Sequence, residues 1–416
     1  MMASLSRVVS QYLDPEKTLL RVMPGGDVEP ITILGNVVAS SPANSTLPSA
    51  DAVSDAAAAE HNEKLEKRLQ ELKAAVGKLY LLTYRYDFPT IPKSVESPIH
   101  LTSVLLRGQL ASLTQQGYTS DAGWGCMIRS TQTLLANSIT QLWLRASSSA
   151  VTTTPPPTSN DALLRLFADD PRAPFSIHNY VAHGSKSFGI APGNWFGPSA
   201  AAKCTRILVD QSPQCGLRVY IASDLADIYE DSLLDTAYGK EDPNIDTESH
   251  EKVFTPTLIL VATKLGRDKI AKAYYEALRF ALSIPQTVGI AGGQPRKSCY
   301  IYGFQSSTFF YLDPHENRPA LRYLPDDSHA TGAQTEYSAN GDGLLEYTPE
   351  ERESTRSRKI QNVDIKDMDP SMLIGFLVTS YDDLLDWYKR MREFSKTNFI
   401  HISRSQLPVE SNYNSD

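Results

Sequence analysis

The sequence predicts an α+β fold with a central antiparallel sheet and one helix that begins at a candidate nucleophile. Three observations predict it. A helical periodicity begins directly after Cys126, two β-rich runs at residues 298–304 and 308–312 are separated by a polar turn, and residues 257–262 are almost continuously apolar. The two runs indicate an antiparallel hairpin, and the apolar run indicates a strand in a sheet that is buried on both faces.

The first candidate site is the stretch of residues 119–130, which reads TSDAGWGCMIRS. From Ile128 onward, apolar groups recur at steps of three and four, the period of an amphipathic helix buried on one side. Cys126 therefore lies at a helix N-terminus, where unpaired N–H groups and the helix dipole favour a thiolate. Gly123 and Gly125 allow a tight turn and a close approach to the sulfur. This stretch alone is consistent with a nucleophile and with a small buried apolar cysteine.

A partner for the thiol is found downstream, at Asp313 and His315. They follow the second strand of the expected hairpin, and residues two apart in an extended chain project to the same face. Pro314 between them cannot donate to a sheet, so the pair is expected at a strand end or sheet edge. A carboxylate beside an imidazole orients the ring and stabilises its protonated form, which in turn stabilises a thiolate. Without Cys126, Asp-Pro-His would be a common turn tripeptide.

Together, the two stretches resemble the autophagins, the papain-like cysteine peptidases that process the ubiquitin-like modifier of autophagy. The resemblance covers most of the chain. Residues 83–91, 188–198, 292–295 and 369–376 resemble, in this order, the family's oxyanion-tyrosine segment, tryptophan segment, gating loop and last core strand. Gly-Trp-Gly-Cys with a later Asp-Pro-His also occurs in the peptidases of the ubiquitin-fold modifier. The segments at 83–91 and 193–198 favour the autophagins.

The resemblance implies a papain-like α+β fold and a catalytic triad of Cys126, His315 and Asp313. Neither a metal ion nor an organic cofactor enters the implied chemistry. Tyr84 is implied as an oxyanion donor, which would act beside the backbone N–H of Cys126. Without the resemblance, Tyr84 would be one of twenty tyrosines that pack a ring and leave the hydroxyl in water.

The resemblance also implies a narrow substrate channel that admits an unbranched, glycine-like tail. Trp195 lies between glycines, as suits an exposed aromatic lid. Gly292, Gly293 and Pro295 match the family's gating loop, and glycine permits the backbone change that a gate requires. On the residues alone, Trp195 fits the core of its own loop equally well, and a plain loop between a helix and a strand would contain the same glycines.

The implied function is cleavage after the C-terminal glycine of the ubiquitin-like autophagy modifier. The implied partner is this modifier, both free and conjugated to phosphatidylethanolamine, with transient contact with autophagic membranes through the conjugate. Two alternatives remain open. One is a peptidase of the ubiquitin-fold modifier. The other is a non-catalytic adaptor that binds the modifier through aromatic-x-x-aliphatic tetrapeptides at residues 381–384 or 399–402.

Charge and composition argue against other classes of protein. A net charge of −8 argues against a nucleic-acid groove. No apolar run approaches the ~20 residues of a membrane span, and the N-terminus lacks the apolar core of a signal peptide, so we expect a cytoplasmic protein with transient recruitment to autophagic membranes. The four cysteines show no metal-binding spacing, and a reducing compartment argues against a disulfide framework.

We expect one peptidase domain from residue 20 to residue 404, although the chain length of 416 by itself would suggest two or three domains. Apolar residues between positions 65 and 79 recur at steps of four and three, which predicts an amphipathic helix packed on this domain. Polar or Pro-rich composition predicts flexible segments at both ends and inside the domain. They are expected at residues 1–19, 40–61, 146–160, 326–367 and 405–416.

Overall fold

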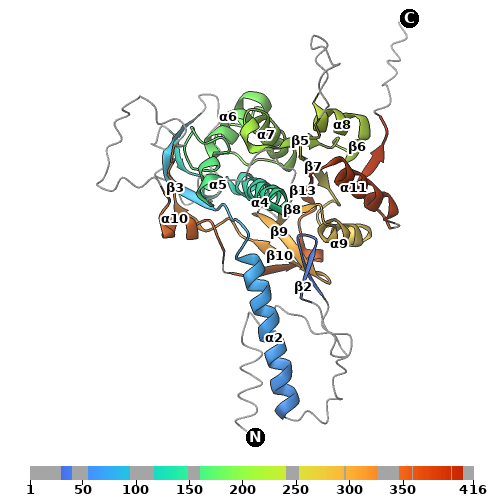
Figure 1. Ribbon diagram of the computed structural model, residues 1–416. Helices are drawn as coiled ribbons and strands as arrows, with labels where there is room; N and C mark the ends of the chain where they lie inside the picture. The colour runs from blue at the N-terminus through green and yellow to red at the C-terminus, as the bar shows by residue number, and fades with distance from the viewer. Residues whose placement is uncertain are drawn as a thin grey trace, which may run out of the picture.

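The computed structural model describes residues 30–39, 55–93, 117–148, 160–239, 253–294, 297–325, 346–357, 359–394 and 396–405. Within these ranges a large sheet is covered by helices on both faces (Figure 1). The mixture of helices and a central sheet confirms the predicted α+β class. No helix in these ranges is long and apolar enough to cross a membrane.

The main sheet has the strand order β12-β10-β9-β8-β13-β7-β5, and β1 pairs with β9 and with β2. Its strands are β1 (Ile31–Ile33), β2 (Asn36–Ala39), β5 (Arg218–Ile221), β7 (Thr257–Lys264), β8 (Thr287–Gln294), β9 (Lys297–Gln305), β10 (Thr308–Leu312), β12 (Gln361–Asp364) and β13 (Ser371–Val378). The expected antiparallel pairing is wrong at one edge, where β5 and β7 are parallel. Parallel neighbours need a crossover, and helix α8 (Glu230–Tyr238) lies between these two strands in the chain.

Smaller sheets and helices complete the described structure. The sheet β11-β3-β4 consists of β11 (Asn317–Pro319), β3 (Tyr84–Pro92) and β4 (Gly117–Ser120), and β14 (His401–Ser403) pairs with β6 (Asp227–Tyr229). The α-helices are α2 (Asp55–Val76), α4 (Cys126–Ser148), α5 (Asn160–Leu166), α6 (Ile177–Phe188), α7 (Pro198–Asp210), α8 (Glu230–Tyr238), α9 (Tyr275–Ser283), α10 (Pro349–Glu353) and α11 (Tyr381–Glu393). Short 3-10 helices are η3 (Pro213–Cys215), η5 (Lys272–Tyr274) and η7 (Ile365–Asp367).

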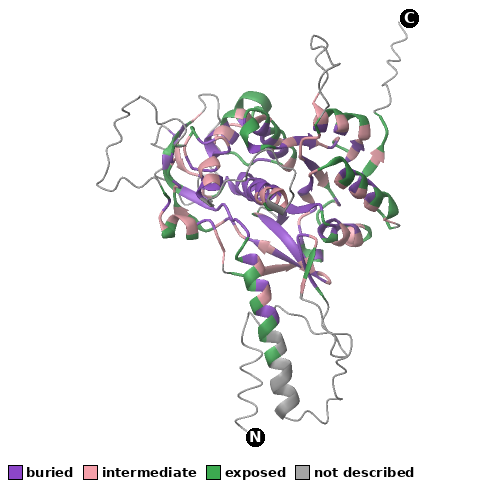
Figure 2. Cartoon of the chain, in the orientation of Figure 1, coloured by how far each residue is buried: buried purple, intermediate pink, exposed green. Residues whose placement is uncertain are grey.

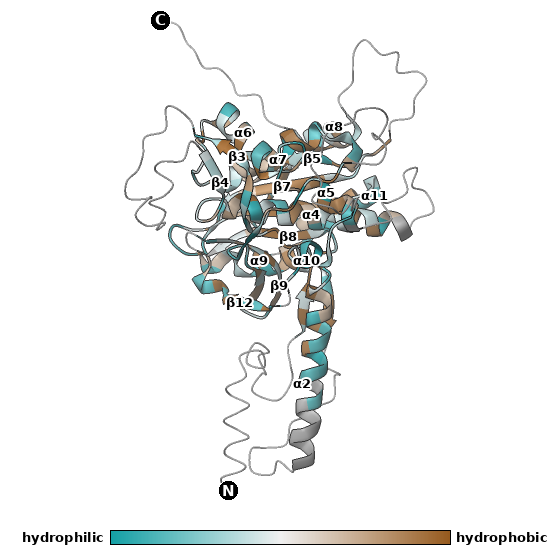
Figure 3. Cartoon of the chain, turned by 90° about the vertical axis from the view of Figure 1, so that its left-hand side faces the viewer, coloured by the Kyte–Doolittle hydropathy of each residue, from teal (hydrophilic) through white to brown (hydrophobic). Residues whose placement is uncertain are grey.

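Two apolar cores lie on opposite faces of the main sheet. Along β7, Leu258 and Leu260 belong to the core that contains α4 and α7, whereas Ile259 and Val261 belong to the core that contains α9 and α11. This alternation explains why β7 is apolar at almost every position, as its colour in Figure 3 shows. It confirms the predicted strand that is buried on both faces, and Figure 2 shows the buried residues concentrated in this centre.

Helix α4 begins at Cys126 as predicted, but residues 126–139 are buried on every side of the helix rather than on one. Its polar side chains are buried because they bond to the segment that leads into β3. Thr133 Oγ1 accepts from the backbone N–H of Leu82 over 3.0 Å, and Asn137 Oδ1 accepts from that of Tyr80 over 3.0 Å. α4 therefore positions the chain immediately before Tyr84.

The predicted amphipathic helix exists and begins earlier than expected. α2 starts at Asp55 and projects away from the body in both views (Figures 1 and 3). Leu69, Leu72 and Val76 near its end are buried in the core that contains α4, which confirms packing on the chain's own core for these residues. The helix also replaces the last part of the expected flexible segment at 40–61.

Part of the expected flexible segment at 326–367 is folded. Helix α10 has a capping box between Thr348 and Glu351, and β12 pairs with β10. The prediction of a flexible segment is therefore wrong for residues 346–357 and 359–367, because capping and strand pairing compensate for a polar composition. Residues 146–148 belong to α4. The remaining parts of the expected flexible segments, apart from Asn160 and Ser405, lie outside the described residues, and the single domain from 20 to 404 stays a prediction.

Candidate active site

A buried ion network holds the turn that precedes α4. The Arg129 guanidinium donates to Asp121 Oδ2 over 2.8 Å and to Asp169 Oδ1 over 2.8 Å. The other carboxylate oxygen of Asp121 accepts from the backbone N–H of Arg85 over 2.7 Å, which fixes β3 beside the turn. All four side chains are buried. The network therefore ties the start of α4 to β3 and to the loop after α5.

Glycine is required at positions 123 and 125, before Cys126, for two different structural reasons. Gly123 has a φ of +85°, a left-handed conformation that favours glycine. At Gly125, a Cβ atom would collide with the carboxylate of Asp121. The carbonyl oxygen of Asp121 accepts from the N–H groups of Trp124 and Gly125, over 3.1 and 2.9 Å. The Gly-Trp-Gly-Cys run therefore closes tightly over Asp121 and places Cys126 at the first position of α4.

We expect Arg129→Met to lower the free energy of unfolding by about 3–5 kcal/mol, because the buried carboxylates of Asp121 and Asp169 lose their main counter-charge. Urea unfolding followed by circular dichroism measures the change. The matched control is Arg206→Met, because Arg206 is 57% exposed and lies 3.9 Å from Asp210. That loss should stay below about 1 kcal/mol. Equal losses in the two variants would contradict the structural role of Arg129.

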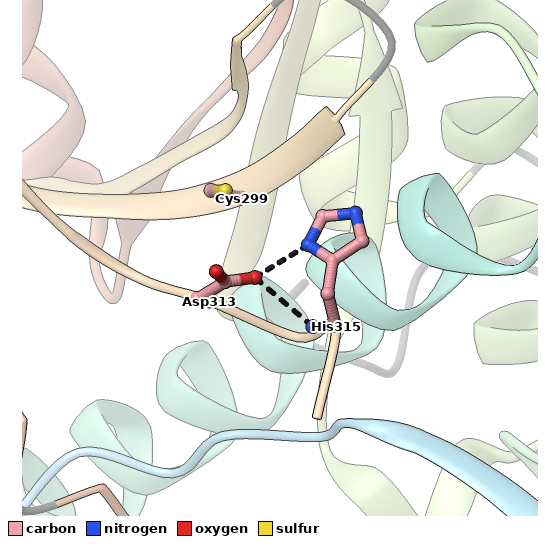
Figure 4. A group of neighbouring side chains, drawn as sticks. All are labelled: Cys299, Asp313 and His315. Carbon is pink, nitrogen blue, oxygen red and sulfur yellow. Dashed lines mark hydrogen bonds and ion pairs between the residues drawn. The ribbon is translucent and has the colours of Figure 1, made fainter. Parts of the chain in front are cut away.

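Asp313 and His315 follow the end of β10, at the position that the sequence predicts. The Asp313 carboxylate accepts from Nδ1–H of His315 and from its backbone N–H, the latter over 3.0 Å (Figure 4). The His315 ring also lies close enough to the Cys126 thiol, at the start of α4, that each group shifts the pKa of the other toward its charged form. The structure therefore brings the three expected triad residues together from α4 and from the end of the β9–β10 hairpin.

The surroundings shift the pKa of the thiol and the pKa of the imidazole in opposite directions. Burial alone would raise the pKa of Cys126, but the neighbouring His315, the Ser298 backbone and Tyr84 outweigh it and leave the pKa below its usual range. Burial opposes the charged form of His315, yet the hydrogen-bonded Asp313 carboxylate and the neighbouring thiols raise its pKa to about 11. Between the two pKa values, Cys126 is a thiolate and His315 is an imidazolium, which is the reactive form of such a pair.

We expect the alkylation of Cys126 by iodoacetamide to have a pH midpoint below the ordinary thiol pKa of about 8.5, because the imidazolium stabilises the thiolate. In His315→Ala the midpoint should rise above that value, since burial then acts without the opposing positive charge. Mass spectrometry of the alkylated peptides measures both midpoints. Burial raises the pKa of Cys215 to about 11, so this cysteine is an internal control. An unchanged midpoint in His315→Ala would contradict the ion pair.

Tyr84, the predicted oxyanion donor, lies beside His315. It is the first residue of β3, and its ring meets the His315 ring edge-on, with centroids 5.2 Å apart. Its hydroxyl lies close enough to the Cys126 thiol to lower the pKa of that thiol. Burial and the neighbouring Cys126 thiolate raise the pKa of Tyr84, so the hydroxyl keeps its proton and remains a donor.

We expect Tyr84→Phe to lower kcat about 10²–10³-fold with little change in KM, because one donor to the oxyanion is lost only in the transition state. Steady-state cleavage of a peptide-extended modifier measures both constants. Tyr86→Phe is the matched control, since Tyr86 lies on the same strand and is 36% exposed. Equal activities of Tyr84→Phe and the unchanged protein would remove Tyr84 from the oxyanion site.

Trp195 lies over the turn that presents the thiol. It precedes α7, is 54% exposed, and its Nε1 donates to the carbonyl oxygen of Gly123 over 2.8 Å. Gly123 is three residues before Cys126, so the indole is anchored at the candidate site while its ring remains accessible. This arrangement supports the predicted lid, whose function stays a prediction.

Gly292 and Gly293 lie inside strand β8 and not in a loop, which differs from the expectation of a gating loop. Both are buried, and a Cβ at Gly292 would lie 2.9 Å from the Cβ of Met372 on β13. Close packing of β8 on β13 therefore explains this glycine. Pro295 lies outside the described residues. A channel role for these three residues stays a prediction.

Two residues of β9 lie beside the thiol although the sequence analysis does not single them out. The Ser298 backbone lowers the pKa of the Cys126 thiol, and the Cys299 thiol lies within 4.8 Å of a donor atom of Asp313 and of His315. Among the described residues, one group of donor atoms is suited to a metal ion, and it consists of Cys299, Asp313 and His315. The only signal for Cys299 in the sequence is its place in the hairpin that ends at Asp313.

The tetrapeptides considered for an adaptor are parts of folded elements. Residues 381–384 form the first turn of α11, with Leu384 fully buried. Phe399 is 5% exposed. Neither aromatic-x-x-aliphatic motif is therefore an extended, accessible segment of the kind that adds a strand to a partner's sheet.

A thiol at a helix N-terminus, facing an Asp–His pair at the end of an antiparallel hairpin, is the arrangement of papain-like cysteine peptidases. A family model described as "Peptidase C54 catalytic domain" matches residues 69–390. The chain belongs to this family, the autophagins, and it is a cysteine protease. This confirms the resemblance drawn from the motifs.

Fungal relatives agree with this assignment. The chain is 46% identical over 333 residues to "Probable cysteine protease atg4" of Sclerotinia sclerotiorum, a match that covers 77% of this chain and 67% of that protein. It is 44% identical over 333 residues to a protein of the same name from Penicillium rubens, covering 79% and 75%. It is 42% identical over 324 residues to "Cysteine protease atg4" of Emericella nidulans, covering 77% and 72%.

Proposed function

We propose that this protease cleaves after the C-terminal glycine of the ubiquitin-like autophagy modifier. The observation that carries the proposal is the hydrogen-bonded pair of Asp313 and His315 beside the Cys126 thiol, whose pKa His315 lowers. Trp195, held over the preceding turn, supports a narrow entrance for an unbranched tail. The names of the fungal relatives, which contain "atg4", support a substrate that belongs to autophagy.

In the proposed mechanism, the Cys126 thiolate attacks the carbonyl carbon of the terminal glycine. The negative charge moves to the carbonyl oxygen, where Tyr84 and the backbone N–H of Cys126 donate hydrogen bonds. The His315 imidazolium gives its proton to the departing amine, which leaves a thioester on Cys126. His315 then takes a proton from water, whose attack releases the glycine carboxylate and restores the thiolate. Asp313 orients the ring through both half-reactions.

The departing amine can be one of two kinds. A peptide extension gives maturation of the precursor, and phosphatidylethanolamine gives removal of the modifier from a membrane. Both are amides of the same glycine, so one site serves both reactions without a metal ion or cofactor. Within this proposal the protein acts in the cytoplasm and contacts autophagic membranes transiently, through the lipid conjugate.

The experiment that tests the function uses an autophagy modifier with a tag after its C-terminal glycine. It is incubated with the full chain, beside a tagged ubiquitin-fold modifier and a Cys126→Ser control. We expect selective cleavage of the first, lost in the control. Cleavage of only the ubiquitin-fold modifier would contradict the proposed substrate, and binding without cleavage would contradict the proposed reaction. Release of the modifier from liposomes that carry its phosphatidylethanolamine conjugate tests the second reaction separately.

A further inference from the structure

A third cysteine borders the Asp–His pair. The thiol of Cys299, an oxygen of Asp313 and a ring nitrogen of His315 all lie within 4.8 Å of one another (Figure 4). Cys299 comes from β9, whereas the other two residues follow β10. The proposed reaction does not use this thiol. Cys126 does not belong to the group.

The spacing of these donor atoms is close to that of a zinc site. Zinc binds sulfur at about 2.3 Å and nitrogen or oxygen at about 2.0–2.2 Å, so tetrahedral ligand atoms lie roughly 3.3–3.8 Å apart. The Cys299 thiol needs to approach the other two donors by at most about 1.5 Å, whereas the hydrogen-bonded Asp313 and His315 need to move apart to reach this geometry. Rotation of the half-buried Asp313 and His315 side chains supplies movements of this size.

The donor types and their exposure also favour zinc. One thiolate, one imidazole and one carboxylate suit a borderline-soft ion, whereas calcium and magnesium prefer oxygen ligands alone. Cys299 is 2% exposed and is the most buried of the three residues. The side chains of His315 and Asp313 are 21% and 32% exposed, so an ion reaches them from solvent. Three protein ligands leave the fourth position to water.

We propose that Cys299, His315 and Asp313 bind Zn²⁺ and that this binding inhibits the protease. The ion takes the place of the proton that His315 Nδ1 shares with Asp313. While the metal is bound, His315 therefore cannot transfer protons beside Cys126, and Asp313 cannot orient the ring for that transfer. The zinc is thus a reversible inhibitor and not a cofactor. The inhibition rests on the proposed function, whereas the binding does not.

The binding experiment separates this site from ordinary zinc capture by the nucleophile. The full-length Cys126→Ser protein, reduced with a phosphine, is titrated with Zn²⁺ against a fluorescent chelator and with Co²⁺ in an absorption spectrometer. We expect one zinc per chain and a thiolate-to-cobalt absorption band. Adding Cys299→Ala should abolish the band and weaken zinc binding at least 10–100-fold, since loss of a direct ligand costs at least as much as loss of an outer partner (about 10–100-fold).

Matched controls keep the result interpretable. Cys204→Ala removes another fully buried cysteine, one that bonds to the carbonyl oxygen of Tyr180, and should leave the band unchanged. Cys299→Ser retains the size of the side chain and should also lose the band. Thermal melts in the presence of a chelator verify that each variant is folded. If Cys299→Ala retains the band, or if Cys126→Ser lacks it, the proposal is overturned.

The inhibition experiment uses the active protein. Cleavage of the tagged modifier is measured against Zn²⁺ concentration for the unchanged chain and for Cys299→Ala and Cys299→Ser, each relative to its own rate with chelator. We expect the half-inhibiting zinc concentration to rise at least tenfold in both variants. Equal values in all three proteins would place the inhibiting zinc on Cys126 and overturn the proposal. If no substrate is cleaved at all, the proposed function fails while the binding result stands.

Discussion

Cys126→Ala is expected to reduce cleavage of the tagged modifier to background, a loss on the order of 10⁶-fold in kcat. The alanine removes the thiol that forms the thioester in the proposed mechanism. His315 and Asp313 keep their hydrogen bonds to each other, because these do not involve Cys126. Affinity for the modifier should therefore persist, and isothermal titration with the uncleaved modifier measures it beside the rate.

Cys215→Ala is the matched control for this loss. Cys215 is also buried, at 3% exposure, but burial raises its pKa to about 11 and it lies in η3, a separate element. The kcat of Cys215→Ala should therefore be close to the kcat of the unchanged protein. Retained turnover in Cys126→Ala would show that another group is the nucleophile, and loss of binding along with turnover would show that the substitution disturbs the fold.

Asp313→Ala is expected to lower kcat by about 10⁴-fold, because the imidazole loses the partner that holds its orientation and tautomer. The pH profile carries a second signature. The Asp313 carboxylate, which accepts hydrogen bonds from His315, is the main group that raises the pKa of His315 to about 11, so its removal moves the alkaline limb of the profile to lower pH. Steady-state rates of cleavage from acidic to alkaline pH measure both effects.

Asp367→Ala is the control for the loss of a carboxylate. Asp367 forms an ion pair with Lys269 over 3.4 Å, and its side chain is 51% exposed, so its loss should not change the profile. A kcat that falls in Asp313→Ala without a shift of the alkaline limb would indicate a purely structural role. An unchanged kcat would remove Asp313 from the triad.

Much of the candidate site could be predicted from local sequence patterns. The helical period after Cys126 placed the thiol at a helix start, and α4 begins at this residue. The β-rich runs before Asp313 predicted the hairpin, and the two-residue spacing placed His315 beside the carboxylate. These predictions succeed because they depend only on residues within a few turns or strand positions of one another.

The position of Cys299 beside Asp313 depends on a register shift in the β9–β10 hairpin, which the pattern of β-rich residues does not predict. The β9–β10 register shifts between Phe310 and Tyr311, after which Leu312 pairs with Tyr300. Continued by one residue, this register places Cys299 opposite Asp313. Without the shift, Tyr300 would lie there, and a one-residue slip turns a strand's side chains to the other face. The irregularity in the hairpin thus decides which side chain borders the Asp–His pair.

The surroundings of α4 also required the tertiary structure. Its residues 126–139 contain enough polar side chains to predict one exposed face, yet all are buried, because Thr133 and Asn137 bond to the segment before β3. The network of Arg129 with Asp121 and Asp169 joins residues up to 48 positions apart. No local period encodes such partners.

Sequence patterns alone therefore predicted the candidate nucleophile, its Asp–His partner and the α+β class, because helix starts, hairpins and neighbouring side chains follow from short-range spacing. The folded chain decided how Tyr84 and Trp195 meet the turn before the cysteine, how β5 joins β7 in parallel, and how Cys299 reaches His315. These contacts join segments that are distant in the chain, and they form only when the two cores pack on the sheet.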